Sequence, residues 1–196
     1  MDIRLAKQQR LDALYAPYKN CTKCPLGSLG RTRVVFGEGN PDATLLLTGE
    51  APGRKEDLEG KPFIGQSGHL LDQALALAGI VRSETFIGSI VKCRPPNNRT
   101  PRPLEIATCT KLFLFNQIAI IEPRIICALG SVALNVFVSQ KTSISKVRGT
   151  LLPYKEGIYI FPTYHPAYLL RNRSQMQIWL DDFKLLAELL STITKD

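Results

Sequence analysis

Residues 44–57 read TLLLTGEAPGRKED, and this stretch decides the fold of the chain. The apolar run at 45–47 has the composition of a buried strand, and the Gly-acid-x-Pro-Gly that follows it predicts a tight, stiff loop. In open α/β sheets, ligands bind at the carboxyl ends of the strands, which is the position of Glu50. We therefore take Glu50 as the candidate centre of an active site.

Three more apolar runs, at residues 85–91, 124–129 and 157–164, alternate with helical patterns at 4–19, 70–79, 105–121 and 174–192. Strands that alternate with helices indicate a three-layer α/β/α sandwich with a mostly parallel sheet of four strands. The whole chain, 1–196, is expected to form one domain. Because parallel strands share their carboxyl edge, Ser89 and His165 are predicted to converge on Glu50 at that edge.

The basic composition of the chain indicates a negatively charged partner. A net charge of +8 and a pI near 9.4 favour a polyanion, and basic residues gather in loops at 92–102 and 139–149. The first residues, MDIR, do not resemble a signal peptide, and no uninterrupted apolar run reaches membrane-spanning length. We expect a cytoplasmic protein without a membrane-spanning segment.

The five cysteines argue against a disulfide framework in such a compartment. Cys21 and Cys24 are separated by two residues, and Cys93 and Cys109 lie far downstream. Four thiolates from separate segments can ligate an iron–sulfur cluster or a structural zinc ion, and four unrelated cysteines remain the alternative. Cys127 lies inside an apolar run, which predicts a small core residue.

Residues 60–71, GKPFIGQSGHLL, predict a loop followed by a helix with Ser67 as its N-cap. A helix start preceded by glycines can bind an anion such as phosphate. Phe63 lies in the loop, where its ring either stacks on a flat ligand or packs into the core. His165 follows a predicted strand and precedes a proline, and it is either structural or a source of charge stabilisation.

These motifs, taken together, resemble the iron–sulfur uracil-DNA glycosylases, often called family 4. The matching pieces are Cys-x-x-Cys at 21–24, GEAPG with Glu56 and Asp57, GKPFIGxSG at 60–68, VKCRPP at 91–96, Cys109, and HPxYLLR at 165–171. They occur in the order typical of the family and span nearly the whole chain. Each motif alone is weak, whereas the set is specific.

The resemblance implies a four-stranded parallel sheet and an enzyme that hydrolyses the N-glycosidic bond of uracil in DNA to leave an abasic site. The target base flips into a pocket, where Gly49, Ala51, Phe63 and Ser89 are expected to contact it. His165 is expected to stabilise charge on the departing uracil, and Glu50 to position water and favour the cationic sugar. The expected DNA contacts are Ser67, Gly68, Arg94, Arg99, Leu170 and Arg171.

The resemblance also implies that Cys21, Cys24, Cys93 and Cys109 hold a [4Fe–4S] cluster with a structural role. The partner is DNA, double- or single-stranded, and a monomer is the default state. Leu169, Leu170 or Arg171 is expected to fill the space left by the flipped base.

Ser89 departs from the family pattern, which has asparagine at this position. An amide offers an acceptor and a donor that match uracil N3–H and O4, whereas serine has one hydroxyl. The alternatives are therefore a glycosylase for hypoxanthine or xanthine, and a non-catalytic DNA-binding or redox-sensing iron–sulfur protein.

Two other classes of protein are disfavoured. One related branch of the family forms a covalent bond to DNA through a histidine in an inserted basic loop, and no such insertion is evident in this sequence. A nucleotide-binding enzyme is disfavoured because no Gly-x-Gly-x-x-Gly or Gly-Lys-[Ser/Thr] loop occurs.

Overall fold

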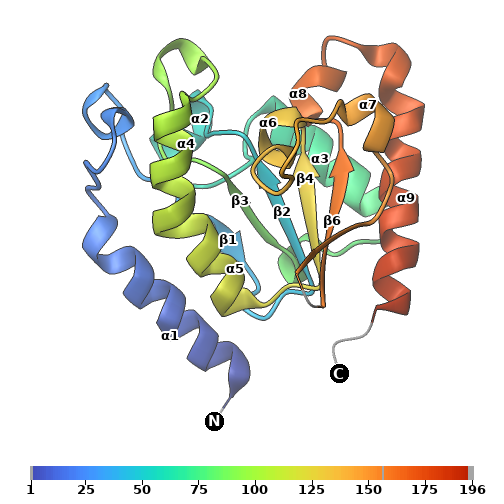
Figure 1. Cartoon of the computed structure of the whole chain (residues 1–196), viewed down its shortest axis with the longest axis horizontal. Helices are drawn as coiled ribbons and strands as arrows, with labels where there is room; N and C mark the ends of the chain where they lie inside the picture. The colour runs from blue at the N-terminus through green and yellow to red at the C-terminus, as the bar shows by residue number, and fades with distance from the viewer. Residues whose placement is uncertain (1, 156, 194–196) are drawn as a thin grey trace.

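The structure, a computed structural model, describes residues 2–155 and 157–193 and contains a six-stranded sheet with helices on both faces (Figure 1). The order is β1-β3-β2-β4-β6-β5. The strands are β1 Glu38–Gly39, β2 Leu45–Gly49, β3 Phe86–Ser89, β4 Ile125–Leu129, β5 Leu152–Lys155 and β6 Ile158–Thr163. The four central strands are parallel, and each edge carries a short antiparallel strand. The predicted sandwich is confirmed, with two edge strands that the sequence did not reveal.

Helices α1, α4 and α5 cover one face of the sheet, and α3 and α9 cover the other (Figure 1). The helices are α1 Ile3–Tyr15, α2 Arg54–Glu59, α3 Gln66–Leu77, α4 Pro103–Cys109, α5 Phe115–Ile121, α6 Ser131–Leu134, α7 Ile144–Val147, α8 Pro166–Leu169 and α9 Met176–Thr192. Short 3₁₀ turns lie at η1 Ala16–Tyr18, η2 Pro25–Ser28, η3 Arg82–Glu84, η4 Pro96–Asn98 and η6 Arg173–Gln175.

The central strands are apolar throughout because both of their faces are buried. In β2, Leu46 packs in the cluster beneath α1 and α5, whereas Leu45 and Leu47 pack toward α3 and α9. In β4, Cys127 is fully buried on the α3 and α9 side, which confirms its prediction as a core residue.

Two helix predictions need correction. Helix α3 begins at Gln66 with Gly65 as its N-cap, so Ser67 lies inside the first turn and is not the cap. The single helix expected over 105–121 begins at Pro103 and is interrupted by a π-helical turn, η5 Thr110–Leu114. The Thr110 hydroxyl donates to the carbonyl of Ile106 within this turn. π-helical turns are frequent at functional sites, and this one directly follows Cys109.

The run Pro103–Ile121 is the one helix in the described part of the chain that is long and apolar enough to cross a membrane. Half of it is buried inside the fold, where α5 packs against α1. A core helix passes the same test of length and composition, and its packing here is that of a core helix.

Candidate functional site

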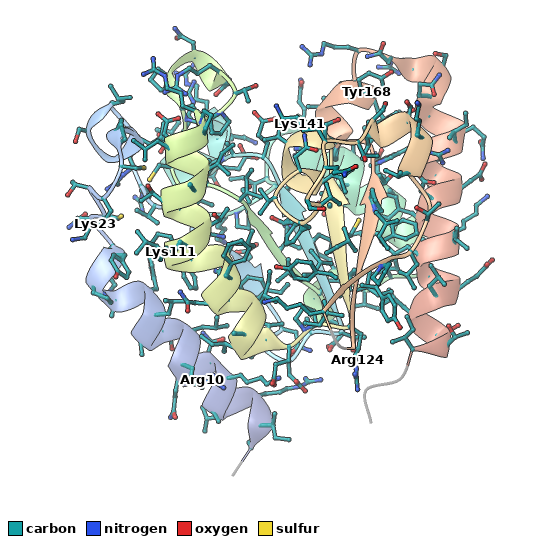
Figure 2. The ribbon with its side chains drawn as sticks, viewed as in Figure 1. Arg10, Lys23, Lys111, Arg124, Lys141 and Tyr168 are labelled. Atoms are coloured by element: carbon teal, nitrogen blue, oxygen red, sulfur yellow. The ribbon has the colours of Figure 1, made fainter. Side chains whose placement is uncertain are left out.

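The carboxyl ends of β2, β3 and β6 meet at one edge of the sheet, the edge that carries α2 and α8 in Figure 1. Gly49 and Ser89 are register partners there, and Thr163 precedes the segment that carries His165. Figure 2 shows Tyr168 and Lys141 at this end of the molecule, and Arg10 and Arg124 at the other.

A cavity of about 410 Å³ opens at this edge. Eight of the predicted site residues line it: Glu50, Ala51, Phe63, Ser67, Ser89, Arg99, His165 and Arg171. The convergence predicted from the strand ends is therefore present in the structure. A volume of this size is in the range of pockets that bind small ligands.

Gly49 forms the point where Phe63 and His165 approach the sheet. A Cβ on Gly49 would lie 2.5 Å from Phe63 Cζ and 3.2 Å from His165 Nε2. The two rings are 5.8 Å apart between centroids and tilted by 33°. The absence of a side chain at Gly49 therefore allows an aromatic ring and an imidazole to share one wall of the cavity.

His165 has a defined tautomer. Its Nδ1 accepts the N–H of Ala167 at 3.1 Å, so the proton of the neutral ring lies on Nε2, the atom nearest Gly49. Desolvation lowers the pKa of His165 to about 4, and the nearby Glu56 only partly opposes this shift. At neutral pH, His165 therefore presents an uncharged N–H donor beside the cavity.

Glu50 is partly buried at the end of β2. Desolvation raises the pKa of this carboxyl, and a hydrogen bond from the Thr100 side chain lowers it by a smaller amount. A carboxylate with a raised pKa is a better base than an exposed one, and it faces the same cavity as His165. Ser89 lies at the end of β3, the strand next to β2, with 4% of its surface exposed.

Arg99 and Arg94 are less free than their place in a basic loop suggested. The Arg99 guanidinium makes two hydrogen bonds, 2.7 and 2.9 Å long, to the buried carboxylate of Glu105. The same carboxylate accepts the backbone N–H of Arg102 at 2.7 Å. Arg94 Nε donates to Asn98 Oδ1 at 2.7 Å. These contacts order the loop that carries both arginines.

Not all of the other predicted DNA contacts line the cavity. Gly68 lies inside α3, where a Cβ would meet the Phe63 carbonyl oxygen at 1.8 Å, so its position serves the Phe63 loop. Leu170 lines a neighbouring groove beside α3 and α9 and is absent from the lining of the cavity. Leu169 is fully buried and is therefore excluded as a wedge between bases.

Glu56, Thr100 and Tyr168 also line the cavity, although the sequence predicted no role at the site for any of them. Glu56 and Tyr168 entered only as parts of the matching motifs. Tyr168 is 38% exposed and its ring lies 4.9 Å from that of Tyr164. An aromatic residue three positions after His165, on the short helix α8, was the available signal. For Glu56 the available signal was its place beside the GEAPG motif, whereas Thr100 carried no signal, because it lies in a loop rich in arginine and proline.

A tight turn, η2, follows Cys24 and lies against the Cys21 backbone. The Gly27 N–H donates to the Cys24 carbonyl at 3.0 Å, and a Cβ on Gly27 would lie 2.4 Å from the Cys21 carbonyl oxygen. Cys93 and Cys109 are buried nearby, and all five cysteines are free. Both of these thiols interact electrostatically with Cys21 and Cys24, so the four sulfurs share one region.

The surroundings of the four thiols are cationic. Desolvation raises the pKa of Cys93 to about 12, and the nearby Arg31 opposes this shift. The backbone N–H of Lys92 donates to Cys109 Sγ at 3.2 Å. In the described part of the chain, the buried Lys92 Nζ and Arg31 Nε have no hydrogen-bond partner. The Arg31 guanidinium also donates to the Cys21 carbonyl at 2.8 Å, so it lies beside these thiols. Two cationic side chains at this place, one of them fully buried, fit a group of negative charge held by thiolates.

Within residues 2–155 and 157–193, no three histidine, cysteine or acidic residues lie close enough to hold a single metal ion. A four-iron cluster spreads its thiolate ligands farther apart than one zinc ion does. The donor set, four sulfurs within electrostatic reach of one another, is one that thiolate-ligated metal groups use.

Comparison with known proteins shows which family this chain resembles in sequence. The family model described as "Uracil DNA glycosylase superfamily" matches residues 36–190. The chain is 48% identical to the "Type-4 uracil-DNA glycosylase" of Thermotoga maritima, over 91% of this chain and 93% of that protein. Proteins of the same name from Sulfurisphaera tokodaii and Saccharolobus solfataricus are 45% and 40% identical, over 88% and 93% of this chain and 81% and 87% of their own lengths.

Proposed function

Since this chain belongs to the type-4 uracil-DNA glycosylases of the uracil-DNA glycosylase superfamily, we propose a role for each residue of its cavity in uracil excision. The protein is a DNA-repair hydrolase that acts on the N-glycosidic bond of uracil in DNA. Neither a change to another deaminated base nor a loss of catalysis is favoured by these relatives.

The observation that carries the mechanism is the joint placement of Glu50, His165 and Phe63 on one cavity. A uracil that leaves the DNA stack enters this cavity and stacks on Phe63, with Gly49, Ala51 and Ser89 around its edges. As the glycosidic bond breaks, negative charge grows on uracil. The His165 Nε2–H donates to the uracil oxygen and stabilises that charge without a net charge of its own.

Glu50 acts on the sugar side of the bond. Its ionised carboxylate orients a water molecule and stabilises the cationic character of the deoxyribose. The water adds to the sugar carbon, its proton is accepted by the carboxylate, and uracil leaves with the bonding electron pair. No covalent bond to the protein is formed, so the product is an abasic site and the DNA strand stays intact.

The DNA backbone is proposed to bind around the opening of the cavity. Arg171 and Ser67 line the cavity itself, and Arg94, in the loop after β3, is proposed to face phosphate. Arg99 supports this loop through Glu105, so its effect on DNA is proposed to be indirect. Gly68 and Leu170 are also proposed to contact DNA, with Leu170 or Arg171 filling the gap left by the base.

Cys21, Cys24, Cys93 and Cys109 are proposed to hold a [4Fe–4S] cluster. The cluster supplies structural order and takes no part in the hydrolysis. Cys93 precedes the arginine loop and Cys24 precedes η2 Pro25–Ser28, so a shared cluster fixes two segments far apart in sequence. The buried Lys92 and the partly buried Arg31 balance its negative charge. The enzyme is further proposed to be a cytoplasmic monomer without a membrane anchor.

The activity is tested with labelled oligonucleotides that contain one uracil opposite guanine, opposite adenine or in a single strand. Alkali after incubation should cut the strand at the uracil position, and omission of alkali should leave it uncut. Strands with cytosine, thymine, hypoxanthine or xanthine at the same position measure selectivity. A folded protein that leaves every uracil strand alkali-stable would contradict the proposed mechanism.

Replacement of Ser89 by asparagine is expected to raise kcat/KM for uracil. The amide restores a paired donor and acceptor at a buried position, and an unpaired polar edge costs about 1–3 kcal/mol, so a gain of roughly tenfold is expected. Ser89→Ala is the matched control and should lower kcat/KM. An unchanged kcat/KM in Ser89→Asn, with normal folding, would count against Ser89 as a base-reading residue.

Replacement of Cys109 by serine is expected to remove the brown colour, iron and acid-labile sulfide from the purified protein. The loss of an element that ties distant segments should also lower Tm by roughly 10 °C. Cys127→Ala is the control, because Cys127 lies in the core of β4 away from the other four thiols. Full retention of iron in Cys109→Ser would remove Cys109 from the ligand set.

A further inference from the structure

Phe63 has a backbone conformation that its side chain disfavours. Its φ is +51°, in the left-handed region that large side chains rarely occupy. The residue is nevertheless well packed, with 6% of its surface exposed. A strained conformation persists only where surrounding contacts hold it, and such positions gather at binding sites.

Glu56 supplies the contacts that hold the residues directly after Phe63. Its Oε1 accepts the backbone N–H of Ile64 at 3.0 Å and that of Gly65 at 2.8 Å. The carboxylate thus joins the first turn of α2 to the loop that leads into α3. Two glycines make room for it, because a Cβ on Gly53 or Gly65 would lie 2.7 or 3.2 Å from a Glu56 oxygen.

Gly68, in the first turn of α3, packs against the backbone of Phe63. A Cβ at this position would meet the Phe63 carbonyl oxygen at 1.8 Å, so the first turn of α3 presses against the Phe63 backbone. The Phe63 conformation is therefore fixed by the Glu56 carboxylate after it and by the Gly68 backbone beneath it. Glu56 also lines the cavity, on the side where Phe63 and His165 share a wall.

We propose that Glu56 is a positioning residue for uracil recognition, which acts by holding Phe63 at the angle from which its ring can stack on the base. The proposal rests on the role given above to Phe63. Glu56 does not need to touch the base, because its effect passes through the N–H groups of Ile64 and Gly65. Its contribution should appear in base binding and should be absent from DNA backbone binding.

The test compares Glu56→Ala, Glu56→Gln and Phe63→Ala with the wild-type enzyme. Alanine leaves both N–H groups without their acceptor. Glutamine keeps one oxygen, and the single atom Oε1 accepts both bonds in the structure, so glutamine can retain the loop. Glu59 lies exposed on the same helix, so Glu59→Ala and Glu59→Gln are matched controls for charge and helix effects.

Two quantities are measured: the inhibition constant of free uracil, and the affinity for an oligonucleotide that carries an abasic site. Glu56→Ala should weaken uracil inhibition about tenfold, as Phe63→Ala does, while abasic-site affinity stays unchanged. KM for uracil-containing DNA should rise in parallel. Glu56→Gln should stay within about threefold of the wild-type value.

The outcomes separate the two proposals. If Phe63→Ala weakens uracil binding and a folded Glu56→Ala does not, the role of Glu56 is wrong and that of Phe63 stands. If Phe63→Ala binds uracil as the wild type does, the stacking role fails and the role of Glu56 fails with it. Equal losses in Glu56→Ala and Glu56→Gln would show that charge matters and that loop positioning does not. If Glu56→Ala does not fold, the other two variants still test the proposal. Wild-type uracil inhibition in Phe63→Ala would overturn it. A loss of uracil inhibition in Glu56→Gln as large as that in Phe63→Ala would also overturn it.

Discussion

Replacement of Glu50 by glutamine is expected to lower kcat for uracil excision about 10²–10⁴-fold, the usual range for loss of a positioned acid–base group. Glutamine keeps the shape of the side chain at the end of β2 and removes its negative charge. It therefore cannot accept a proton from water or stabilise the cationic sugar. Single-turnover cleavage of a uracil-containing oligonucleotide measures the change, and affinity for abasic-site DNA is expected to be preserved.

The pH dependence provides a second measurement on the same residue. Desolvation raises the pKa of Glu50, so the carboxylate is protonated at a higher pH than an exposed glutamate would be. The acid limb of log kcat should therefore lie above pH 4.5, with activity lost as the pH falls through it. This limb should disappear in Glu50→Gln. A Glu50→Gln enzyme with wild-type kcat would contradict the catalytic role of Glu50.

Replacement of His165 by alanine is expected to lower kcat about 10²–10³-fold, as observed when one donor to a developing anion is removed. The donor is the Nε2–H of a neutral ring, since Nδ1 accepts the Ala167 N–H and desolvation lowers the pKa of His165 to about 4. The wild-type profile should consequently show no limb near pH 6.5, the ordinary pKa of histidine.

His69 provides the matched control for that prediction. It is the other histidine of the chain and lies exposed on α3. His69→Ala should retain wild-type kcat. An equal loss in both histidine variants would indicate a general effect on folding or DNA binding. A kcat limb near pH 6.5 that His165→Ala abolishes would show that His165 acts as a cation.

The buried parallel strands could be predicted from the sequence because uninterrupted apolar runs such as those of β2 and β4 have few other uses in a chain of this length. The edge strands could not. β1 Glu38–Gly39 has two residues, and β5 Leu152–Lys155 mixes proline, tyrosine and lysine, so neither shows a strand period. Helix α2 Arg54–Glu59 was missed for a related reason, because it is polar apart from one leucine.

The site was predicted where a residue sits at a strand end, and missed where a tertiary contact decides its role. Glu50 and His165 follow apolar runs and Ser89 lies near the end of one, so their convergence could be derived. The partnership of Arg99 with Glu105 could not, since Arg99 lies in the loop before α4 and Glu105 in its first turn, so no regular helical spacing relates them. The left-handed backbone of Phe63 is likewise set by contacts that become visible only in the folded chain.

The order of the strands in the sheet has a consequence during biosynthesis. Glu50 and Phe63 are made early, whereas His165 follows β6, which pairs with the central part of the sheet through β4. At about 5–20 residues per second, a chain of 196 residues takes roughly 10–40 s to be synthesised from its N-terminus. A nascent chain that ends before β6 has the stacking ring and the carboxylate but lacks the donor to the leaving base. The full rate of base removal therefore requires that β6, the last parallel strand, has joined the sheet and placed His165 at the cavity.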